Sequence, residues 1–326
     1  MITKNPMRQT RPLRPSRREF IRTATTMSLA AAAGPSALFG ALDVTAKAAQ
    51  PEPKTLIGSN IYGWGQYYQR EKKDVMEHLD EVLSALRDAG YDYLEATMDS
   101  AQPENNAQLA DRMKAKGLQP VSIYTGGRLH EAGKASEVVE KLLVACRVCR
   151  QAGFRVISCN ADPIGREKTD DELKVQAAAF TEFGKGLKEM GMKLGVHHHL
   201  PEMANHAREF HYIFRHTDPA LVGFCYDVHW VYRGGIAPAE ALAEYGNRVV
   251  SWHLRQSRNG IWWEDLDTGD IDYQAVAQYA REHSLARRFT VELALENGTR
   301  ITRSVVENHR RSIVFVRHVF GDQKPA

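Results

Sequence analysis

The chain has 326 residues, of which 43 are basic and 40 are acidic, and its formal net charge is +3. Eight of the basic and two of the acidic residues lie in the first 48 positions, so the remainder has a formal charge of −3, which argues against a globally basic nucleic-acid-binding surface. The four cysteines imply no disulfide framework. Cys146 and Cys149 form a C-x-x-C inside a predicted helix, where we expect buried helix surface rather than a redox site.

The first 48 residues have the features of a bacterial export signal. Arg17 and Arg18 form a twin-arginine pair, an apolar, alanine-rich stretch covers residues 24–41, and residues 46–48 are a small-x-small cleavage site. The apolar run is short and interrupted by Gly and Pro, so we expect no stable membrane anchor. We therefore predict a twin-arginine signal peptide over residues 1–48 and a periplasmic location.

Residues 49–326 alternate between strand-like and helix-like patterns. The predicted strands cover residues 56–60, 91–95, 118–124, 154–159, 193–198, 221–226, 248–253 and 288–293. A helical pattern follows each strand, and four of these helices end at a glycine, namely Gly90, Gly117, Gly153 and Gly191. Eight such units predict an α/β fold, a single (β/α)8 TIM barrel over residues 49–326.

Four of the predicted strands end on residue types that bind divalent cations. These residues are His197, Asp227, His253 and Glu292. In a parallel barrel the C-terminal ends of all strands meet on one face, so these side chains can converge on one ion. A carboxylate such as Asp227 is costly to bury without a cation or a donor, although an N-cap or a salt bridge to Arg233 or Arg248 is the plainer alternative.

Neighbouring residues extend the predicted site. His199 shares a strand face with His197, while His198 points the other way and is expected to pack against a helix. Glu95 ends the second strand, and the candidate catalytic residues are Glu292, His199 and Glu95. Aromatic residues on loops that follow strands either hold sugar rings or pack over the barrel mouth. The candidate substrate contacts are His229, Trp230, Arg255 and Trp64.

The donor set indicates one divalent metal ion. Two imidazoles and two carboxylates suit Mn²⁺, which we expect first, with Zn²⁺ or Co²⁺ as alternatives. An ion held this way leaves positions for a carbonyl and a neighbouring hydroxyl oxygen, and it acidifies the C–H between them. A nearby Glu or His then moves the proton.

With these motifs the chain resembles the xylose-isomerase-like barrel superfamily, and within it the sugar phosphate isomerase/epimerase group. The family pattern places an H-N-H or E-N-H element on strand five, then D-x-x-W or D-x-x-H, H-L-K-D, G-x-G-x-x-D and a closing V-E. The matching segments here are residues 197–199, 227–230, 253–256, 269–272 and 291–292. The resemblance implies one divalent cation held by His197, Asp227, His253 and Glu292.

Two departures from the family pattern affect the expected reaction. Strand five offers His197 where epimerases usually have Glu, so the two-glutamate proton shuttle of ketose 3-epimerases is not expected. The usual Lys-Asp after the strand-seven histidine is Arg255-Gln256, which alters substrate contacts. These departures favour a relative that acts on keto sugars or 3-keto glycosides by isomerisation or elimination.

The leading hypothesis is thus a periplasmic, metal-dependent sugar isomerase or epimerase whose partner is a small-molecule sugar or glycoside. A lyase that cleaves 3-keto glycosides by elimination is the first alternative, and a non-catalytic periplasmic sugar-binding barrel is another. A DNA-repair endonuclease shares the barrel, but the charge of −3 and the export signal argue against a nucleic-acid partner. The sequence leaves the oligomeric state open, a homo-oligomer included.

Overall fold

The computed structural model describes residues 54–321. The predicted signal peptide over residues 1–48 lies outside these residues and stays a prediction. Within the described part of the chain, no helix combines the length and the apolar character that a membrane span requires.

Eight parallel strands form one continuous sheet. They are β1 (Leu56–Asn60), β2 (Tyr93–Glu95), β3 (Ser122–Gly127), β4 (Val156–Ala161), β5 (Lys193–Val196), β6 (Val222–Asp227), β7 (Val249–Leu254) and β10 (Arg288–Val291). Their order in the sheet is β2-β1-β10-β7-β6-β5-β4-β3, which is the chain order of a barrel opened between β2 and β3.

The sheet closes just beyond β2. Thr97 forms a parallel bridge with Tyr124 of β3. The Tyr124 N–H donates to the Ala96 carbonyl at 2.9 Å, and the Met98 N–H donates to the Tyr124 carbonyl at 2.7 Å. The strand β2 itself is too short to reach β3, so the residues that follow it complete the ring. The predicted (β/α)8 barrel is confirmed.

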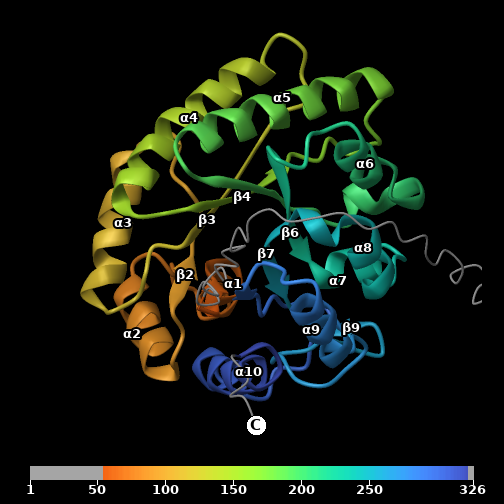
Figure 1. The fold of residues 1–326 in the computed structure, drawn as a ribbon. Coiled ribbons are helices and arrows are strands. Elements are labelled where there is room, and N and C mark those ends of the chain that lie inside the picture. Colours follow the sequence, from red (N-terminus) through yellow and green to blue (C-terminus); the bar gives the residue numbers. More distant parts are fainter. Residues whose placement is uncertain (1–53, 322–326) are drawn as a thin grey trace, which may run out of the picture. The chain divides into compact units, whose positions relative to one another are not determined.

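Helices surround the strands, as Figure 1 shows. They are α2 (Leu79–Ala89), α3 (Glu104–Ala115), α4 (Ala135–Ala152), α5 (Asp170–Glu189), α6 (Ala204–Arg215), α8 (Pro238–Tyr245), α9 (Tyr273–Glu282) and α10 (Val305–Phe320). The four predicted glycines follow α2, α3, α4 and α5 with φ between 68° and 121°, a left-handed conformation that glycine adopts at low cost. The C-x-x-C cysteines are buried in α4, as expected.

Several short elements were not predicted, and all but one of them follow the C-terminal end of a strand. They are α1 (Ile61–Arg70) after β1, η1 (Pro201–Met203) after β5, α7 (Val228–Arg233) after β6, and the hairpin β8 (Ser257–Arg258) and β9 (Ile261–Trp262) after β7. A further 3-10 turn, η2 (Gly246–Arg248), precedes β7. Asn60 caps α1 and Asp227 caps α7, each by accepting a backbone N–H two or three residues on.

Side chains of β6 show how the strands separate the core from the site. Phe224 packs against Phe214 of α6 with ring centroids 4.9 Å apart, and Tyr226 packs against Trp252 at 5.4 Å. Because side chains alternate along a strand, Asp227 projects to the opposite side, into the barrel. The outward residues therefore form the helix-packing core while the inward ones are available for chemistry.

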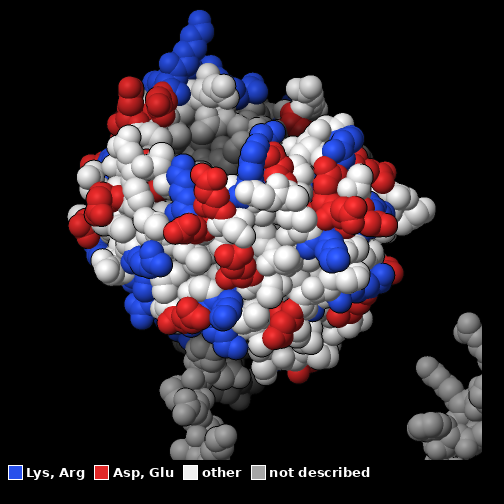
Figure 2. Space-filling model, turned by 90° about the horizontal axis from the view of Figure 1, so that it is seen from above, with Lys and Arg blue, Asp and Glu red and all other residues white. Residues whose placement is uncertain are grey.

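On the face drawn in Figure 2, acidic and basic side chains are interspersed, and no continuous basic surface is seen there. The prediction that the protein has no nucleic-acid partner stays a prediction.

We predict that Gly184→Ala destabilises the barrel. Gly184 lies inside α5, and a Cβ atom there would overlap the backbone carbonyl of Leu221. Backbone cannot yield as a flexible side chain does, so we expect a loss of about 1–3 kcal/mol in the free energy of unfolding, measured by urea denaturation.

The matched control is Gly65→Ala in α1, where the nearest atom to an added Cβ is Val75 Cγ1 at 3.7 Å. This change should be neutral or should stabilise the protein by up to about 1 kcal/mol, because alanine favours helix more than glycine does. Equal effects of the two substitutions would contradict the close contact between α5 and Leu221.

Candidate active site

The four predicted ligand residues converge at the C-terminal face of the barrel. His197 directly follows β5, Asp227 ends β6, His253 lies in β7, and Glu292 directly follows β10. All four are buried, and each offers a nitrogen or oxygen atom within 4.8 Å of those of the others. The predicted convergence of these side chains is therefore confirmed.

A continuous set of polar contacts links the four side chains. His197 Nε2 lies 3.3 Å from Asp227 Oδ2, and His253 Nδ1 lies 2.9 Å from Glu292 Oε2. The Arg255 guanidinium joins the two pairs, since its Nη2 lies 2.7 Å from Asp227 Oδ2 and 2.9 Å from Glu292 Oε1. The sequence predicted a substrate contact for Arg255, whereas the structure places its guanidinium against two carboxylates of the cluster.

Glu95 supports the cluster from the inside of the barrel. Its Oε1 lies 2.7 Å from His253 Nε2 and accepts from Asn60 Nδ2 at 3.0 Å. Its Oε2 accepts from Ser158 Oγ at 2.9 Å and from Ser122 Oγ. Burial alone would raise the pKa of Glu95, but His253 and these hydroxyls outweigh burial and lower it. Glu95 is thus an ionised, fully engaged carboxylate that fixes the His253 ring.

His199 lies at the mouth of the cluster. Its ring centroid is 4.7 Å from that of His197 and 6.0 Å from that of Trp230, and the side chain is half-buried. Burial, followed by the neighbouring His197, lowers the pKa of His199 to about 3. The imidazole is therefore neutral at pH 7 and faces the site without being held by the carboxylates.

Trp230, His229 and Trp262, an aromatic residue of the loop after β7, form an aromatic wall beside Arg255. The Arg255 guanidinium carbon lies 4.6 Å from the ring centroid of Trp262 and 5.2 Å from that of Trp230. His229 is buried, and burial lowers its pKa to about 4. Within residues 54–321, neither ring nitrogen of His229 nor Nε1 of Trp262 has a hydrogen-bond partner. Such buried donors and acceptors are suited to the hydroxyl groups of a ligand.

Two residues singled out from the sequence lie away from the cluster. Trp64 stacks on His309 of α10 with ring centroids 4.3 Å apart, and its indole N–H donates to Ser59 Oγ at 3.1 Å. Trp64 therefore packs α1 against the barrel, and the structure does not bring it to the site as a substrate contact. His198 packs against Phe210 of α6 at 4.8 Å, as the alternation along the strand predicts.

Tyr124 belongs to the site although sequence reasoning did not select it. Its ring centroid lies 5.5 Å from that of His197 and 6.3 Å from that of His253, and its hydroxyl donates to Asn160 Oδ1 at 2.6 Å. A tyrosine within an apolar strand gives the same pattern as a core residue. Only its position within β3, facing the barrel axis, could have indicated this role.

The charge inside the cluster favours a cation. Three buried carboxylates, those of Glu95, Asp227 and Glu292, face one guanidinium, which leaves two negative charges if the imidazoles are neutral. Burying uncompensated charge is costly. Although burial opposes its charged form, the Cys225 side chain and the nearby carboxylates raise the pKa of His253 well above its ordinary value. The site therefore attracts positive charge, as a proton or as a divalent ion.

The carboxylates are already ionised in this setting. Burial alone would raise the pKa of Asp227 and of Glu292, but Arg255 outweighs burial and lowers both, that of Glu292 to about 2. In addition, within the described part of the chain, His197 Nδ1 has no hydrogen-bond partner. Ionised carboxylates and available imidazole nitrogens are the forms that ligate a divalent metal, so the residues fit the predicted ion.

A family model described as xylose isomerase-like TIM barrel matches residues 83–312. The chain belongs to this family. An inosose dehydratase of Geobacillus kaustophilus is 26% identical over 230 residues, which cover 64% of this chain and 69% of that protein.

Two solved structures have the same fold. A sugar phosphate isomerase/epimerase of Parabacteroides distasonis superposes with a TM-score of 0.67, 20% identity and coverage of 84% of this chain and 97% of the other. An L-ribulose 3-epimerase gives a TM-score of 0.65, 18% identity and coverage of 82% and 95%. At this identity the superpositions show the fold alone.

We predict that Arg255→Met strongly destabilises this xylose isomerase-like barrel when divalent metal has been removed by chelation. The change leaves Asp227 and Glu292 buried without their shared guanidinium, which should cost about 3–5 kcal/mol in the free energy of unfolding. Added Mn²⁺ should restore part of this loss, because the ion supplies the missing positive charge. Urea denaturation with and without Mn²⁺ measures both effects.

The control for this prediction is Arg233→Met. Arg233 binds Glu296 through two contacts of 2.9 Å, but its side chain is 25% exposed. The decrease in the free energy of unfolding of Arg233→Met should be smaller than that of Arg255→Met, and added Mn²⁺ should not change it. Equal losses for the two variants, or no recovery of Arg255→Met with metal, would show that the guanidinium does not neutralise a metal-binding cluster.

A further prediction concerns Glu202 in η1. Its Oε2 accepts from the His199 N–H at 2.8 Å, and burial raises its pKa to about 7 from an ordinary 4.5. Between these values the folded protein holds a proton that the unfolded chain has lost, so stability falls as pH rises through this window. Glu202→Gln mimics the protonated form. We expect it to match the wild type near pH 4.5 and to be more stable at pH 8, by up to about 3 kcal/mol.

Urea midpoints of both proteins between pH 4.5 and 8 check this prediction. His199→Gln is not a suitable control, because it alters the site, whereas Glu189→Gln at the end of α5 changes an exposed carboxylate of the same type. Parallel pH profiles for the wild type and Glu202→Gln would show that Glu202 is ionised at neutral pH.

Proposed function

We propose that this protein is a divalent-metal-dependent enzyme that removes a proton beside the carbonyl group of a sugar or sugar derivative. The observation that carries the proposal is the buried cluster of His197, Asp227, His253 and Glu292, beside which three carboxylates face a single guanidinium. The known relatives support a sugar-modifying enzyme, since they include an inosose dehydratase and sugar epimerases. We further propose export through the twin-arginine pathway, on the pattern of residues 1–48.

In this proposal His197, Asp227, His253 and Glu292 hold the ion, with Mn²⁺ first and Zn²⁺ or Co²⁺ as alternatives. When bound, such an ion polarises a carbonyl and an adjacent hydroxyl oxygen and so acidifies the intervening C–H. Glu95 holds the His253 ring in one orientation, and Arg255 keeps both ligand carboxylates ionised. Charge that develops on the substrate oxygens would thus be met by side chains that these contacts already hold in place.

His199 is our candidate for moving the proton. It is half-buried and adjacent to the cluster, whereas both oxygens of Glu95 and of Glu292 are engaged by other groups. A general base must lie within reach of the substrate and be unprotonated at the working pH. Glu292 remains the second candidate, because binding an ion would release its contact with Arg255 or His253. His229, Trp230 and Trp262 would bind the sugar hydroxyls and ring.

Two reaction classes share the first step, the removal of a proton beside the carbonyl, and differ in the step that follows. Isomerisation or epimerisation returns the proton to carbon, and it is our leading proposal, in line with the fold shared with epimerases. Elimination expels a group from the neighbouring carbon, and it is favoured by the relative named as a dehydratase. His197 also favours elimination, because it stands on strand five where epimerases usually have a glutamate. The carboxylates near the cluster contact other residues and do not supply a second shuttle.

The deciding experiment compares the metal content and proton exchange of the mature wild-type protein with those of His253→Ala. We expect about one equivalent of Mn, Zn or Co in the wild type and its loss in the variant, measured by elemental analysis. In D₂O the wild type should introduce deuterium beside the carbonyl of ketohexoses or 3-keto glucosides, and the variant should be slower by at least about 100-fold. His216→Ala, which changes an exposed histidine after α6, should retain both properties.

A wild-type protein that holds no metal and takes up none would overturn the metal-dependent mechanism. Binding of keto sugars without deuterium exchange by the metal-loaded protein would instead indicate a sugar-binding barrel. Product analysis by NMR separates the remaining classes, since epimers retain all atoms of the substrate whereas elimination yields an unsaturated product.

A further inference from the structure

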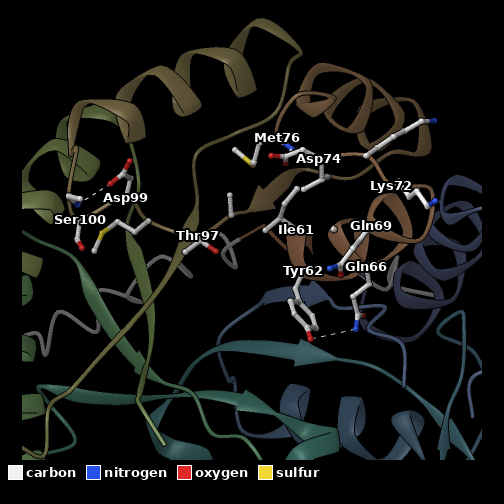
Figure 3. A pocket seen from close by; sticks show the side chains of 16 residues that line it. Ile61, Tyr62, Gln66, Gln69, Lys72, Asp74, Met76, Thr97, Asp99 and Ser100 are labelled. Carbon is white, nitrogen blue, oxygen red and sulfur yellow. Dashed lines mark hydrogen bonds between the residues drawn. The ribbon is translucent and has the colours of Figure 1, made fainter. Parts of the chain in front are cut away.

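A large pocket of about 1030 Å³ opens beside the cluster, at the C-terminal ends of β1 and β2. One wall is α1, the second is the segment 96–101 after β2, and the third is the connector 72–76 between α1 and α2. Figure 3 shows Tyr62 and Gln66 on the α1 side, Asp99 and Ser100 on the opposite side, and Thr97 and Ile61 between them.

Two walls of the pocket begin next to residues of the carboxylate network. Thr97 lies two residues after Glu95 on the same side of the strand, and it bridges to Tyr124, which contacts His197. On the other wall, Asn60 donates to Glu95 and accepts from the backbone N–H of Tyr62 at 2.7 Å. A molecule bound at the cluster can therefore extend over Thr97 and Tyr62 into the pocket.

The wall formed by α1 is fixed to the segment that carries Glu292. The Gln66 side chain donates to the Leu295 carbonyl at 3.0 Å and accepts from the Leu295 N–H at 2.6 Å. These two bonds tie α1 to the chain three residues after Glu292. The position of Tyr62 relative to the cluster is thus set by the same backbone that places a proposed metal ligand.

The lining of the pocket combines apolar and polar side chains. The apolar residues of the wall are Ile61, Tyr62, Val75, Met76, Ala96 and Met98. Tyr62 and Met76 are large side chains that remain 56% and 49% exposed. Exposed apolar groups gathered in one hollow mark a binding surface. Of the two lysines in the lining, Lys73 is paired with Glu71 at 2.7 Å.

The size of the pocket exceeds what a single sugar requires. Ligand sites for drug-sized molecules measure roughly 300–1,000 Å³, and this pocket lies at the upper end of that range without counting the cluster itself. A monosaccharide carries a hydroxyl on nearly every carbon and would leave the apolar side chains of the wall without an apolar partner. The natural complement is a sugar that bears a second, mainly apolar group.

We propose that the substrates are keto glycosides with an aromatic or largely apolar aglycone, which lies in this pocket while the carbonyl-bearing sugar ring lies at the cluster. The inference rests on the proposed function and specifies its substrate class. Tyr62 offers its ring face to the aglycone, and Met76 and Met98 offer deformable apolar surface. Hydroxyls of an aromatic aglycone can bond to Gln69, Asp99 or Ser100 at the rim.

The test uses two substrates that share one keto sugar, methyl 3-keto-glucoside and phenyl 3-keto-glucoside, with the mature metal-loaded protein. We expect the wild type to have a KM at least about tenfold lower for the phenyl compound. Tyr62→Ala removes the ring platform, and Gly65→Leu places a side chain in the pocket from the α1 wall. Both should reduce the preference to about threefold or less, while the metal content stays unchanged.

Val314→Ala is the control, since Val314 is 70% exposed on α10 and lies outside this pocket. Its preference for the phenyl compound should equal that of the wild type. Equal KM values for the two substrates in the wild type would overturn the aglycone pocket and leave the proposed function intact. A change in KM for both substrates in Tyr62→Ala would likewise overturn it, by showing a general effect on the site.

A protein that holds no metal and turns over neither substrate would overturn the proposed function. The pocket is then decided separately, by tryptophan fluorescence titration with phenyl β-glucoside, which requires no turnover. Tighter binding of phenyl than of methyl β-glucoside, lost in Tyr62→Ala, would support the pocket. The same affinity for both compounds would overturn it.

Discussion

The burial of three carboxylates beside a single guanidinium is the constraint on which this site depends. Glu95, Asp227 and Glu292 lie at the C-terminal face of the barrel, where Arg255 compensates only part of their charge. In a medium of low dielectric constant this deficit must be met by added positive charge. A proton on His253 meets part of it, and a divalent ion would meet all of it. The same deficit thus explains the raised pKa of His253 and the affinity for metal that we propose.

Holding such a cluster requires side chains that perform more than one task. Asn60 accepts the Tyr62 N–H that begins α1, and it donates to Glu95 through its other amide atom. Asp227 accepts the Trp230 N–H that begins α7 with one oxygen, and its other oxygen binds Arg255 and His197. Each residue therefore ends a strand, starts a helix and orients the site. A substitution at either position would disturb fold and chemistry together.

Residues that both cap a helix and orient the site explain in part which features could be predicted from the sequence. The barrel and its four ligand residues follow from repeated strand and helix patterns, because the topology alone brings the strand ends together. Helices α1 and α7 are short and rich in aromatic residues, and Asp227, the cap of α7, was assigned to the site, so both helices were missed. The position of Arg255 between two carboxylates and the packing of Trp64 on His309 depend on tertiary contacts that no local pattern records.

The chemistry and the proposed specificity are carried by different loops. The cluster rests on β5, β6, β7 and β10, and its carboxylates are engaged on every side, so it has little freedom to adapt to a ligand. The pocket is formed by α1, its connector and the segment after β2, where large side chains such as Tyr62 are exposed. Changes in that wall would alter which group is bound while the charge balance around Glu95 is preserved. A rigid, charge-compensated centre beside an adaptable apolar wall would let such a barrel exchange substrates and keep its first chemical step.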